Sequence, residues 1–290
     1  MDGSNIQFDN LTHLSLNTMS LIDTFRILRN TPRLVFFQVS GFCTLHRDFR
    51  EHRYRPPVLS SLRSLQLLIK SCGEYFLDNL IAPHLEEFLL PRYYITRIEV
   101  VTSFFRRSAC SLHSFSMTFS VFPEYFDALM NVLQSMPSLT KLSLLSTTTL
   151  PVVIPTPEEY HPRSILQLVA KVLFSQTTSL KQGFLPNLKT LEYTGKLYLH
   201  SGNYDELYPL PAADNGVHGP LHFLKFDLQQ PNRVPENMIL YISSLARRGV
   251  TVNVFCYSKD ILQSSIDYYR SKEDSLSQDW TDNFDSSLFS

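Results

Sequence analysis

Three groups of residues in this chain have side-chain types that could support chemistry. The first is Glu158-Glu159-Tyr160-His161, which places carboxylates next to an imidazole, two ligand types that bind zinc. A zinc site needs three or four converging ligands, and Pro157 and Pro162 favour a loop over a helix face. We therefore expect no metal site at this position.

The second group is the thiols, Cys43, Cys72, Cys110 and Cys256, with nine histidines as candidate bases. Cys72 is the residue that could be assigned as a nucleophile, but no sequence motif pairs it with a histidine, and a buried cysteine without such a partner is inert. The cysteines are far apart and form no C-x-x-C pair. This spacing favours reduced thiols in a reducing compartment, so we expect a cytoplasmic or nuclear protein.

The third group is a basic and aromatic segment at 43–58, CTLHRDFREHRYRPPV. Interleaved basic and aromatic side chains can bind an acidic peptide or a nucleic acid. The net charge of −1 argues against nucleic acid, which needs a strong positive field. Two interpretations remain open: a solvated loop, or a loop that binds an acidic protein. The residues expected to contact such a protein are Arg47, Arg50, Arg53 and Arg55.

Motifs for common enzyme chemistry are missing from the sequence. It contains no G-x-S-x-G elbow, no phosphate-binding loop, no G-x-G-x-x-G fingerprint and no H-E-x-x-H pair. It also has no run of about 18 apolar residues that would span a membrane. We expect a protein that is not an enzyme, uses no cofactor or metal, and binds neither nucleic acid nor membranes.

One apolar pattern, L-x-x-L-x-L or a close variant, recurs along the chain. The first positions of consecutive matches lie 23, 28, 23, 27, 27, 49 and 33 residues apart. Most of these intervals fall in the range of leucine-rich repeats, roughly 20–29 residues. The matches begin at Leu11, Leu34, Leu62, Leu85, Leu112, Leu139, Leu188 and Leu221.

The segments between these matches have helical periodicity. Leu21, Phe25 and Leu28 share one helix face, and Ile239, Ile242 and Leu245 share another. The stripes Phe126-Leu129-Leu133 and Ile165-Leu168-Val169-Val172 predict two more helices. Four matches follow a proline, at Pro32, Pro83, Pro137 and Pro186, which ends the preceding helix and precedes the strand.

The fold class expected from this alternation is α/β, a leucine-rich-repeat solenoid. It would have a curved parallel sheet on the concave side, helices on the convex side and about eight irregular repeats. We expect a short lead-in at 1–10, a repeat domain at 11–257, a closing helix at 258–270 and a disordered tail at 271–290. Insertions are expected at 43–58, 146–163 and 198–220. A helix at 235–248, capped by Gly249, should lead into a last strand at 249–255.

The amino-acid sequences of the repeats resemble those of a known family. The runs LTHLSLNTMSLIDTFRILRNTPRLVFFQVSG (11–41), SSLRSLQLLI (60–69), APHLEEFLLP (82–91) and FLPNLKTLEY (184–193) are similar to the repeat region of F-box proteins of mushroom-forming fungi. FFRRSACSLHSFSM (104–117) and GVTVNV (249–254) are similar to it as well.

The resemblance covers about residues 10–257 and implies a function. In that family an F-box docks on the adaptor of a cullin–RING ubiquitin ligase, and the repeats hold the protein substrate. No F-box with its Leu-Pro-x-Glu-type opening precedes the first repeat in this sequence. The family role therefore competes with a second interpretation, a stand-alone leucine-rich-repeat binding protein without a ligase.

The expected binding surface follows from strand geometry. Side chains alternate along a strand, so the neighbours of the buried apolar residues should face outward on the concave side. Phe36 with Gln38 is the expected main contact, unless the segment 43–58 covers Phe36. We expect one monomeric chain to bind its protein partner through His13, Phe36, Gln38, Gln66, Glu87, Lys141, Glu192, Lys225 and Asp227.

Overall fold

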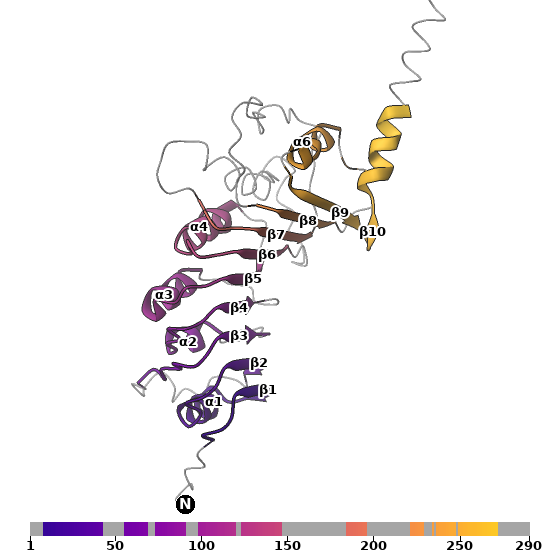
Figure 1. The fold of residues 1–290 in the computed structure, drawn as a ribbon. Coiled ribbons are helices and arrows are strands. Elements are labelled where there is room, and N and C mark those ends of the chain that lie inside the picture. The colour runs from indigo at the N-terminus through magenta and orange to yellow at the C-terminus, as the bar shows by residue number, and fades with distance from the viewer. Residues whose placement is uncertain are drawn as a thin grey trace, which may run out of the picture.

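The structure is a computed structural model that describes residues 8–42, 55–68, 73–90, 98–119, 123–146, 184–195, 221–228, 234, 236–247 and 249–271. Its centre is one ten-stranded sheet whose strands follow one another in sequence order (Figure 1). The strands are β1 (His13–Met19), β2 (Phe36–Phe42), β3 (Ser64–Leu67), β4 (Glu87–Leu90), β5 (Ser114–Phe119), β6 (Lys141–Ser146), β7 (Thr190–Gly195), β8 (Phe223–Leu228), β9 (Thr251–Cys256) and β10 (Lys259–Asp260). The first nine strands are parallel and β10 is antiparallel to β9.

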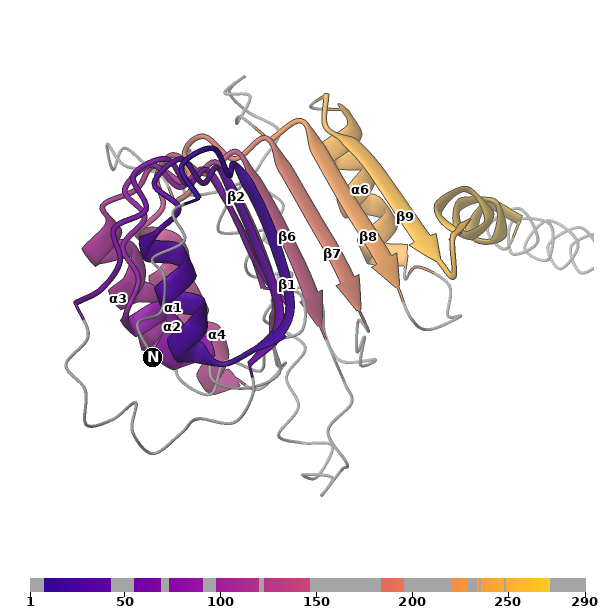
Figure 2. The ribbon, with the colours of Figure 1, turned by 90° about the horizontal axis from the view of Figure 1, so that it is seen from below.

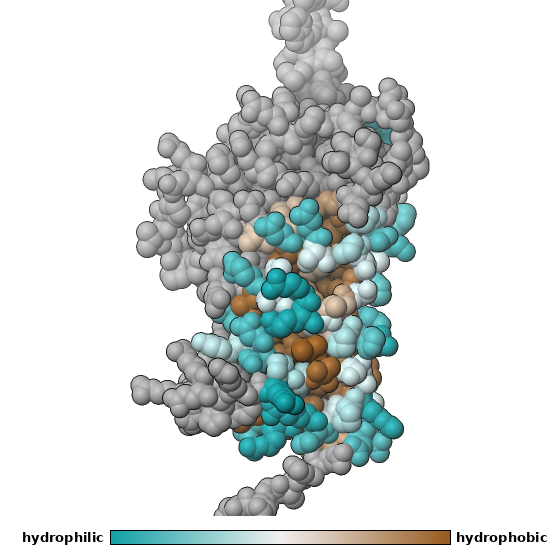
Figure 3. Space-filling model, turned by 90° about the vertical axis from the view of Figure 1, so that its left-hand side faces the viewer, coloured by the Kyte–Doolittle hydropathy of each residue, from teal (hydrophilic) through white to brown (hydrophobic). Residues whose placement is uncertain are grey.

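Described helices follow β1, β3, β4, β5 and β8, and they lie on one face of the sheet (Figures 1 and 2). They are α1 (Leu21–Arg29), α2 (Gly73–Asp78), α3 (Ile98–Ser108), α4 (Pro123–Gln134) and α6 (Glu236–Arg247). Another helix covers residues 262–271. Figure 3 shows the side of the molecule formed by α1–α4, where hydrophilic side chains surround smaller hydrophobic areas. The predicted α/β class with a parallel sheet is confirmed.

The core lies between the strand layer and the helix layer. Phe37, Leu65, Phe88, Phe115 and Leu142 are register neighbours on consecutive strands, and each is at most 1% exposed. The same row continues through Leu191 and Leu224, which are also fully buried. These side chains hold the strands in one register, because a slip by one residue would move them all to the opposite face.

A turn precedes most strands and explains the recurrent prolines. In four of these turns the proline follows the residue whose carbonyl accepts the N–H of the first pattern leucine, as in Thr31-Pro32-Arg33-Leu34 (3.2 Å). Proline suits this second turn position because its φ is already restricted. The carbonyl of the residue before each of β1–β7 then accepts two N–H groups from the next unit; that of Thr140 accepts from Lys189 and Thr190. The turn and the double acceptor thus align the start of each strand.

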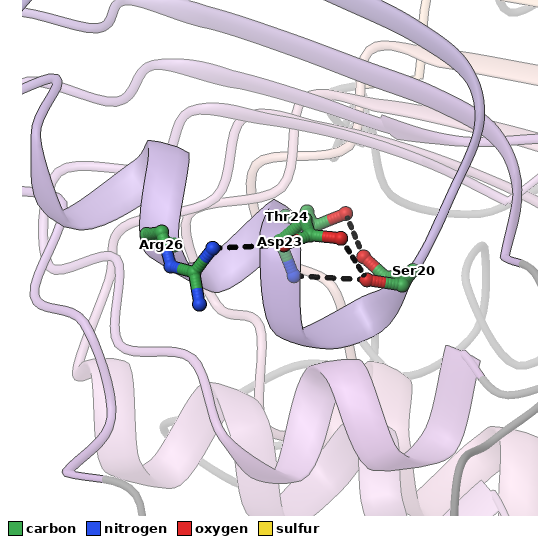
Figure 4. A network of polar contacts seen from close by, with 4 residues as sticks. All are labelled: Ser20, Asp23, Thr24 and Arg26. Carbon is green, nitrogen blue, oxygen red and sulfur yellow. Dashed lines mark hydrogen bonds and ion pairs between the residues drawn. The ribbon is translucent and has the colours of Figure 1, made fainter. Parts of the chain in front are cut away.

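Helix α1 begins at a complete N-terminal cap (Figure 4). The Ser20 Oγ accepts the N–H of Asp23 at 3.1 Å and donates to the Asp23 carboxylate at 2.6 Å. The Thr24 hydroxyl donates to the Ser20 carbonyl, and Arg26 forms an ion pair with Asp23 at 3.2 Å. Ser20 thereby satisfies a backbone donor that has no partner within the helix.

The C-terminal end of the sheet is closed by elements that the sequence predicted only in part. Gly249 has φ of +82°, and the N–H groups of Gly249 and Val250 donate to Ala246 and Leu245, so the predicted cap of α6 is confirmed. The predicted bounds of the closing helix, 258–270, are wrong: the helix covers 262–271, because Tyr257–Asp260 form a hairpin from β9 to β10 that was missed. The two turn residues of this hairpin, Tyr257 and Ser258, have positive φ of 49° and 66°, a conformation normally signalled by Asn-Gly.

Several predicted segments lie outside the described residues. These are the helix stripe at Ile165–Val172, most of the insertions at 43–58 and 146–163, all of the insertion at 198–220, and all but the first residue of the tail at 271–290. Two insertion bounds are wrong: Ser146 belongs to β6, and Val58 forms a parallel β-bridge with Ile81 while Pro57 is buried. Burial of Pro57 and pairing of Val58 return the chain to the packed array before residue 58.

Candidate binding surface on the sheet

The outward side chains of β1–β9 form a continuous surface, here called the strand face. Parallel pairing in register brings equivalent outward residues next to one another on neighbouring strands. The first row is His13, Phe36, Ser64, Glu87, Ser114, Lys141, Thr190, Phe223 and Thr251. The second row is Ser15, Gln38, Gln66, Leu89, Ser116, Ser143, Glu192, Lys225 and Asn253.

All nine residues predicted for this surface lie in the strands, at outward positions. Eight of them belong to the two rows, and Asp227 follows Lys225 two residues later on β8. None is fully buried: His13, Glu87 and Lys141 are exposed and the others are intermediate. The face can therefore contact another molecule through side chains from every part of the sheet.

An aromatic pair marks the N-terminal end of the strand face. The rings of His13 on β1 and Phe36 on β2 are stacked, with centroids 5.8 Å apart. Gln38 lies two residues beyond Phe36 on the same face of β2 and pairs in register with Ser15. This is a flat, partly apolar platform with an amide beside it, a combination that suits contact with a protein side chain.

The middle of the strand face carries short neutral side chains around one carboxylate. Ser64 and Gln66 lie on β3, and Ser114, Ser116 and Ser143 lie on β5 and β6. These five side chains are partly exposed, and the exposed Glu87 on β4 lies between Ser64 and Ser114. This area therefore offers hydroxyl and amide groups that can both donate and accept hydrogen bonds, together with one negative charge.

Charged residues are concentrated in the C-terminal half of the face. The Lys141 Nζ lies 3.1 Å from the Glu192 Oε1, across the β6–β7 pair. The Lys225 Nζ lies 5.5 Å from the centre of the Phe255 ring on β9, within cation–π range. Lysines and carboxylates alternate here, so a partner would meet local charges of both signs instead of one strong field.

Sequence reasoning missed two aromatic residues of this surface, Phe223 and Phe255. Both are half-buried on outward positions of β8 and β9. Phe255 lay within the predicted last strand, and Phe223 follows the first pattern leucine of its unit by two residues, as His13 and Phe36 do. Applying the same alternation to these strands would have identified them.

The basic segment gives little structural information about a second site. Arg55 is exposed and its carbonyl accepts a hydrogen bond of 2.9 Å from Arg29 of α1. Arg47, Arg50 and Arg53 lie outside the described residues. The part of this segment that was expected to cover Phe36 lies outside the described residues as well.

Of the other residues that could support chemistry, some lie outside the described residues and some lie within them. Cys72 and Glu158–His161 lie outside the described residues. Within the described segments no group of three or more His, Cys, Asp or Glu side chains could hold a metal ion, and no helix is long and apolar enough to cross a membrane. Cys110 is partly buried, and this burial raises the pKa of its thiol to about 11.

Comparisons of this chain with protein-family models, with curated proteins and with solved structures give no match.

Proposed function

We propose that this protein is a binding scaffold whose strand face holds another protein. The observation that carries the proposal is the in-register display of outward side chains from nine parallel strands. Among the described residues, the helices that alternate with the strands lie on the opposite face of the sheet and leave the strand face uncovered (Figure 2). A long surface with side chains of mixed types suits a protein partner better than a small molecule, because small molecules bind in concave pockets.

The array is proposed to be a leucine-rich-repeat solenoid. Two observations support this assignment: the eight apolar matches all contain a strand, and the same turn and double acceptor connect consecutive units. The double acceptor also links β6 to β7 across the 49-residue interval, through the Thr140 carbonyl. The unit thus keeps its geometry where the sequence spacing is irregular.

The finer proposal is that the chain is the substrate-recognition domain of an F-box-type ubiquitin ligase receptor. The sequences of the repeats support this proposal, because they resemble that family over about residues 10–257. The alternative is a stand-alone leucine-rich-repeat binding protein with no link to a ubiquitin ligase. Both versions use the strand face as the binding surface.

Site-specific photo-crosslinking tests the binding surface. One photoreactive amino acid replaces Gln66, on β3 of the strand face. In a control variant it replaces Arg106, which is exposed on α3, on the opposite side of the sheet. We expect a defined protein to be crosslinked from Gln66 and not from Arg106. The double substitution Phe36→Ala with Gln38→Ala should reduce the yield at Gln66 severalfold, because aromatic contacts dominate interface energy. Equal yields from both positions, or no effect of the double substitution, would contradict the proposal.

The ligase question needs a separate measurement. The protein crosslinked from Gln66 is followed in cells with and without this chain, and the chain is purified to look for cullin and adaptor subunits. Co-purification of these subunits, with a rise of the crosslinked protein when the chain is removed, supports the F-box-type receptor. A crosslinked protein whose level does not change, without ligase subunits, supports the stand-alone scaffold.

A further inference from the structure

The two ends of the sheet differ in how their edges are closed. At the C-terminal edge, β10 pairs antiparallel with β9, and the Ile261 N–H donates to the Val254 carbonyl at 3.0 Å. At the N-terminal edge, β1 pairs with β2 on one side only. Among the described residues no strand pairs with its other side.

The backbone groups on that free side can be identified. The Thr12 carbonyl accepts the N–H groups of Val35 and Phe36, so it points toward β2. Because backbone polar groups alternate between the two sides of a strand, those of Leu14 and Leu16 also point toward β2. The backbone N–H and C=O groups of His13, Ser15 and Asn17 therefore point away from β2, toward the unpaired side of β1.

The apolar side chains of β1 are less covered than their register neighbours on β2. Phe37 and Val39, their register neighbours on β2, are fully buried, whereas Leu14 and Leu16 are only partly buried. Both leucines pack against the core and keep part of their surface exposed. An added strand with apolar residues at matching positions would bury them.

The strand also lacks the features that normally prevent edge pairing. Such edges usually carry a lysine or proline, a bulge or an inward-pointing charge. β1 has the sequence HLSLNTM, seven residues without a charged side chain, proline or glycine apart from the titratable His13. Nothing in its composition repels a second strand of the same sequence.

We propose that β1 is the interface at which two copies of this chain form a dimer, by antiparallel pairing of their β1 strands. A two-fold axis at Ser15 places His13 opposite Asn17 of the second copy and Ser15 opposite its own equivalent. These are the residues whose backbone groups face outward, so each pair exchanges two hydrogen bonds. The same register places Leu14 opposite Leu16 of the second copy, so apolar side chains meet on the core side.

A second copy fits this edge better than an unrelated strand because the register is self-complementary. Apolar residues meet apolar ones, polar residues meet polar ones, and no like charges face each other. The pairing is isologous, so it closes at two copies and does not propagate into fibres. It joins the two strand faces into one surface, and it replaces the sequence-based expectation of a monomer.

The proposal is tested with charge substitutions at Ser15, whose side chain is exposed on the strand face. In the proposed register the two Ser15 residues are about 5.5 Å apart at Cα, so like charges there would repel. The molar mass of the full chain is measured by analytical ultracentrifugation over a concentration series. We expect dimers for the unsubstituted chain, monomers for Ser15→Lys and for Ser15→Glu, and dimers again when these two variants are mixed. Ser64→Lys, on the same face of β3 but away from the edge, is the control and should leave the dimer intact.

Restoration by mixing separates an interface effect from misfolding, because a destabilised chain would not recover when it meets another destabilised chain. Asn17→Pro gives a second test, since it removes an outward N–H and leaves the β1–β2 hydrogen bonds in place. It should abolish the dimer, whereas Asn17→Ala should keep it. A monomer at every concentration, open-ended oligomers, or a dimer unaffected by both Ser15 variants would overturn the proposal.

Discussion

Lys141 and Glu192 form an ion pair of 3.1 Å on the strand face, although the chain between their strands is the longest connection in the sheet. The two side chains are 48% and 28% exposed. Their pairing follows from the register of β6 and β7, in which Lys141 is opposite Thr190 and Ser143 is opposite Glu192. The pair is diagonal across the two strands, a distance that a long side chain can span.

We expect this ion pair to contribute little to stability. Exposed pairs contribute about 0.2–1 kcal/mol in double-mutant cycles. The free energy of unfolding of Lys141→Ala, Glu192→Ala and the double variant should give a coupling energy in that range, and the coupling should shrink in high salt, where screening is strong. A coupling above about 2 kcal/mol would show that the pair is more desolvated than its exposure indicates.

The Phe76 ring should be a main determinant of stability. It is fully buried on α2, and its centroid lies 5.4 Å from Phe25, 5.9 Å from Phe37 and 5.4 Å from Phe42. Phe76→Ala should lower the free energy of unfolding by about 3–5 kcal/mol, because it leaves a cavity between α1, α2 and β2. Urea unfolding followed by circular dichroism measures this loss.

Val58→Ala is the matched control for the substitution of Phe76. Val58 is 58% exposed and lies close in sequence to the same units. Its truncation should change the unfolding free energy by less than about 0.5 kcal/mol, as for other surface positions. Similar losses for both substitutions would mean that the ring cluster does not hold these units together.

The positions of Phe37, Phe88 and Leu142 in the core could be predicted from the sequence, because strand alternation and leucine spacing determine the same set of residues. The strand face followed from the same alternation. Helix α2 has only six residues and no complete apolar stripe, so its pattern is too short to identify. The β9–β10 hairpin was missed because Tyr257 and Ser258 adopt positive φ without the glycine or asparagine that predicts such a turn.

The ion pair of Lys141 with Glu192 also could not be predicted. Its two residues were assigned separately to the strand face. Alignment of the two pattern matches places Leu142 beside Leu191 and Leu144 beside Tyr193, which is the observed register of β6 and β7. The diagonal contact also depends on the conformations of the two long side chains, which the pattern does not reveal.

Two buried serines should hold their helices through one hydrogen bond each. The Ser108 Oγ, on α3, accepts the N–H of Ala82 at 3.1 Å, and the Ser265 Oγ, on the helix at 262–271, accepts the N–H of Val234 at 3.1 Å. Both serines are at most 2% exposed. Ser108→Ala leaves a buried backbone donor without its acceptor and should cost about 1–3 kcal/mol of unfolding free energy. Ser111→Ala, at an exposed position nearby, should have no measurable effect.

Ser265→Ala should act locally because its helix lies at the end of the array. We expect faster proteolysis within 262–271, with little change in the unfolding of the remaining sheet, since terminal units open separately from the interior. Limited proteolysis with mass spectrometry locates the cuts. Equal acceleration of cleavage throughout the chain would show that this helix is required for the whole fold.

The thiol of Cys110 should be protected in the folded protein and should make stability depend on pH in alkaline solution. Burial raises its pKa from 9.0 to about 11, so folding favours the neutral thiol. The stabilisation is complete below pH 9, where both states are protonated, and it is lost as pH rises toward 11, because the unfolded chain ionises first. The urea midpoint should therefore fall more steeply between pH 9 and 11 for the unsubstituted chain than for Cys110→Ala. At pH 8.5, alkylation of Cys110 should be at least severalfold slower in the folded than in the unfolded chain, because burial lowers the thiolate fraction. Rapid alkylation of the folded protein would contradict the burial of this side chain.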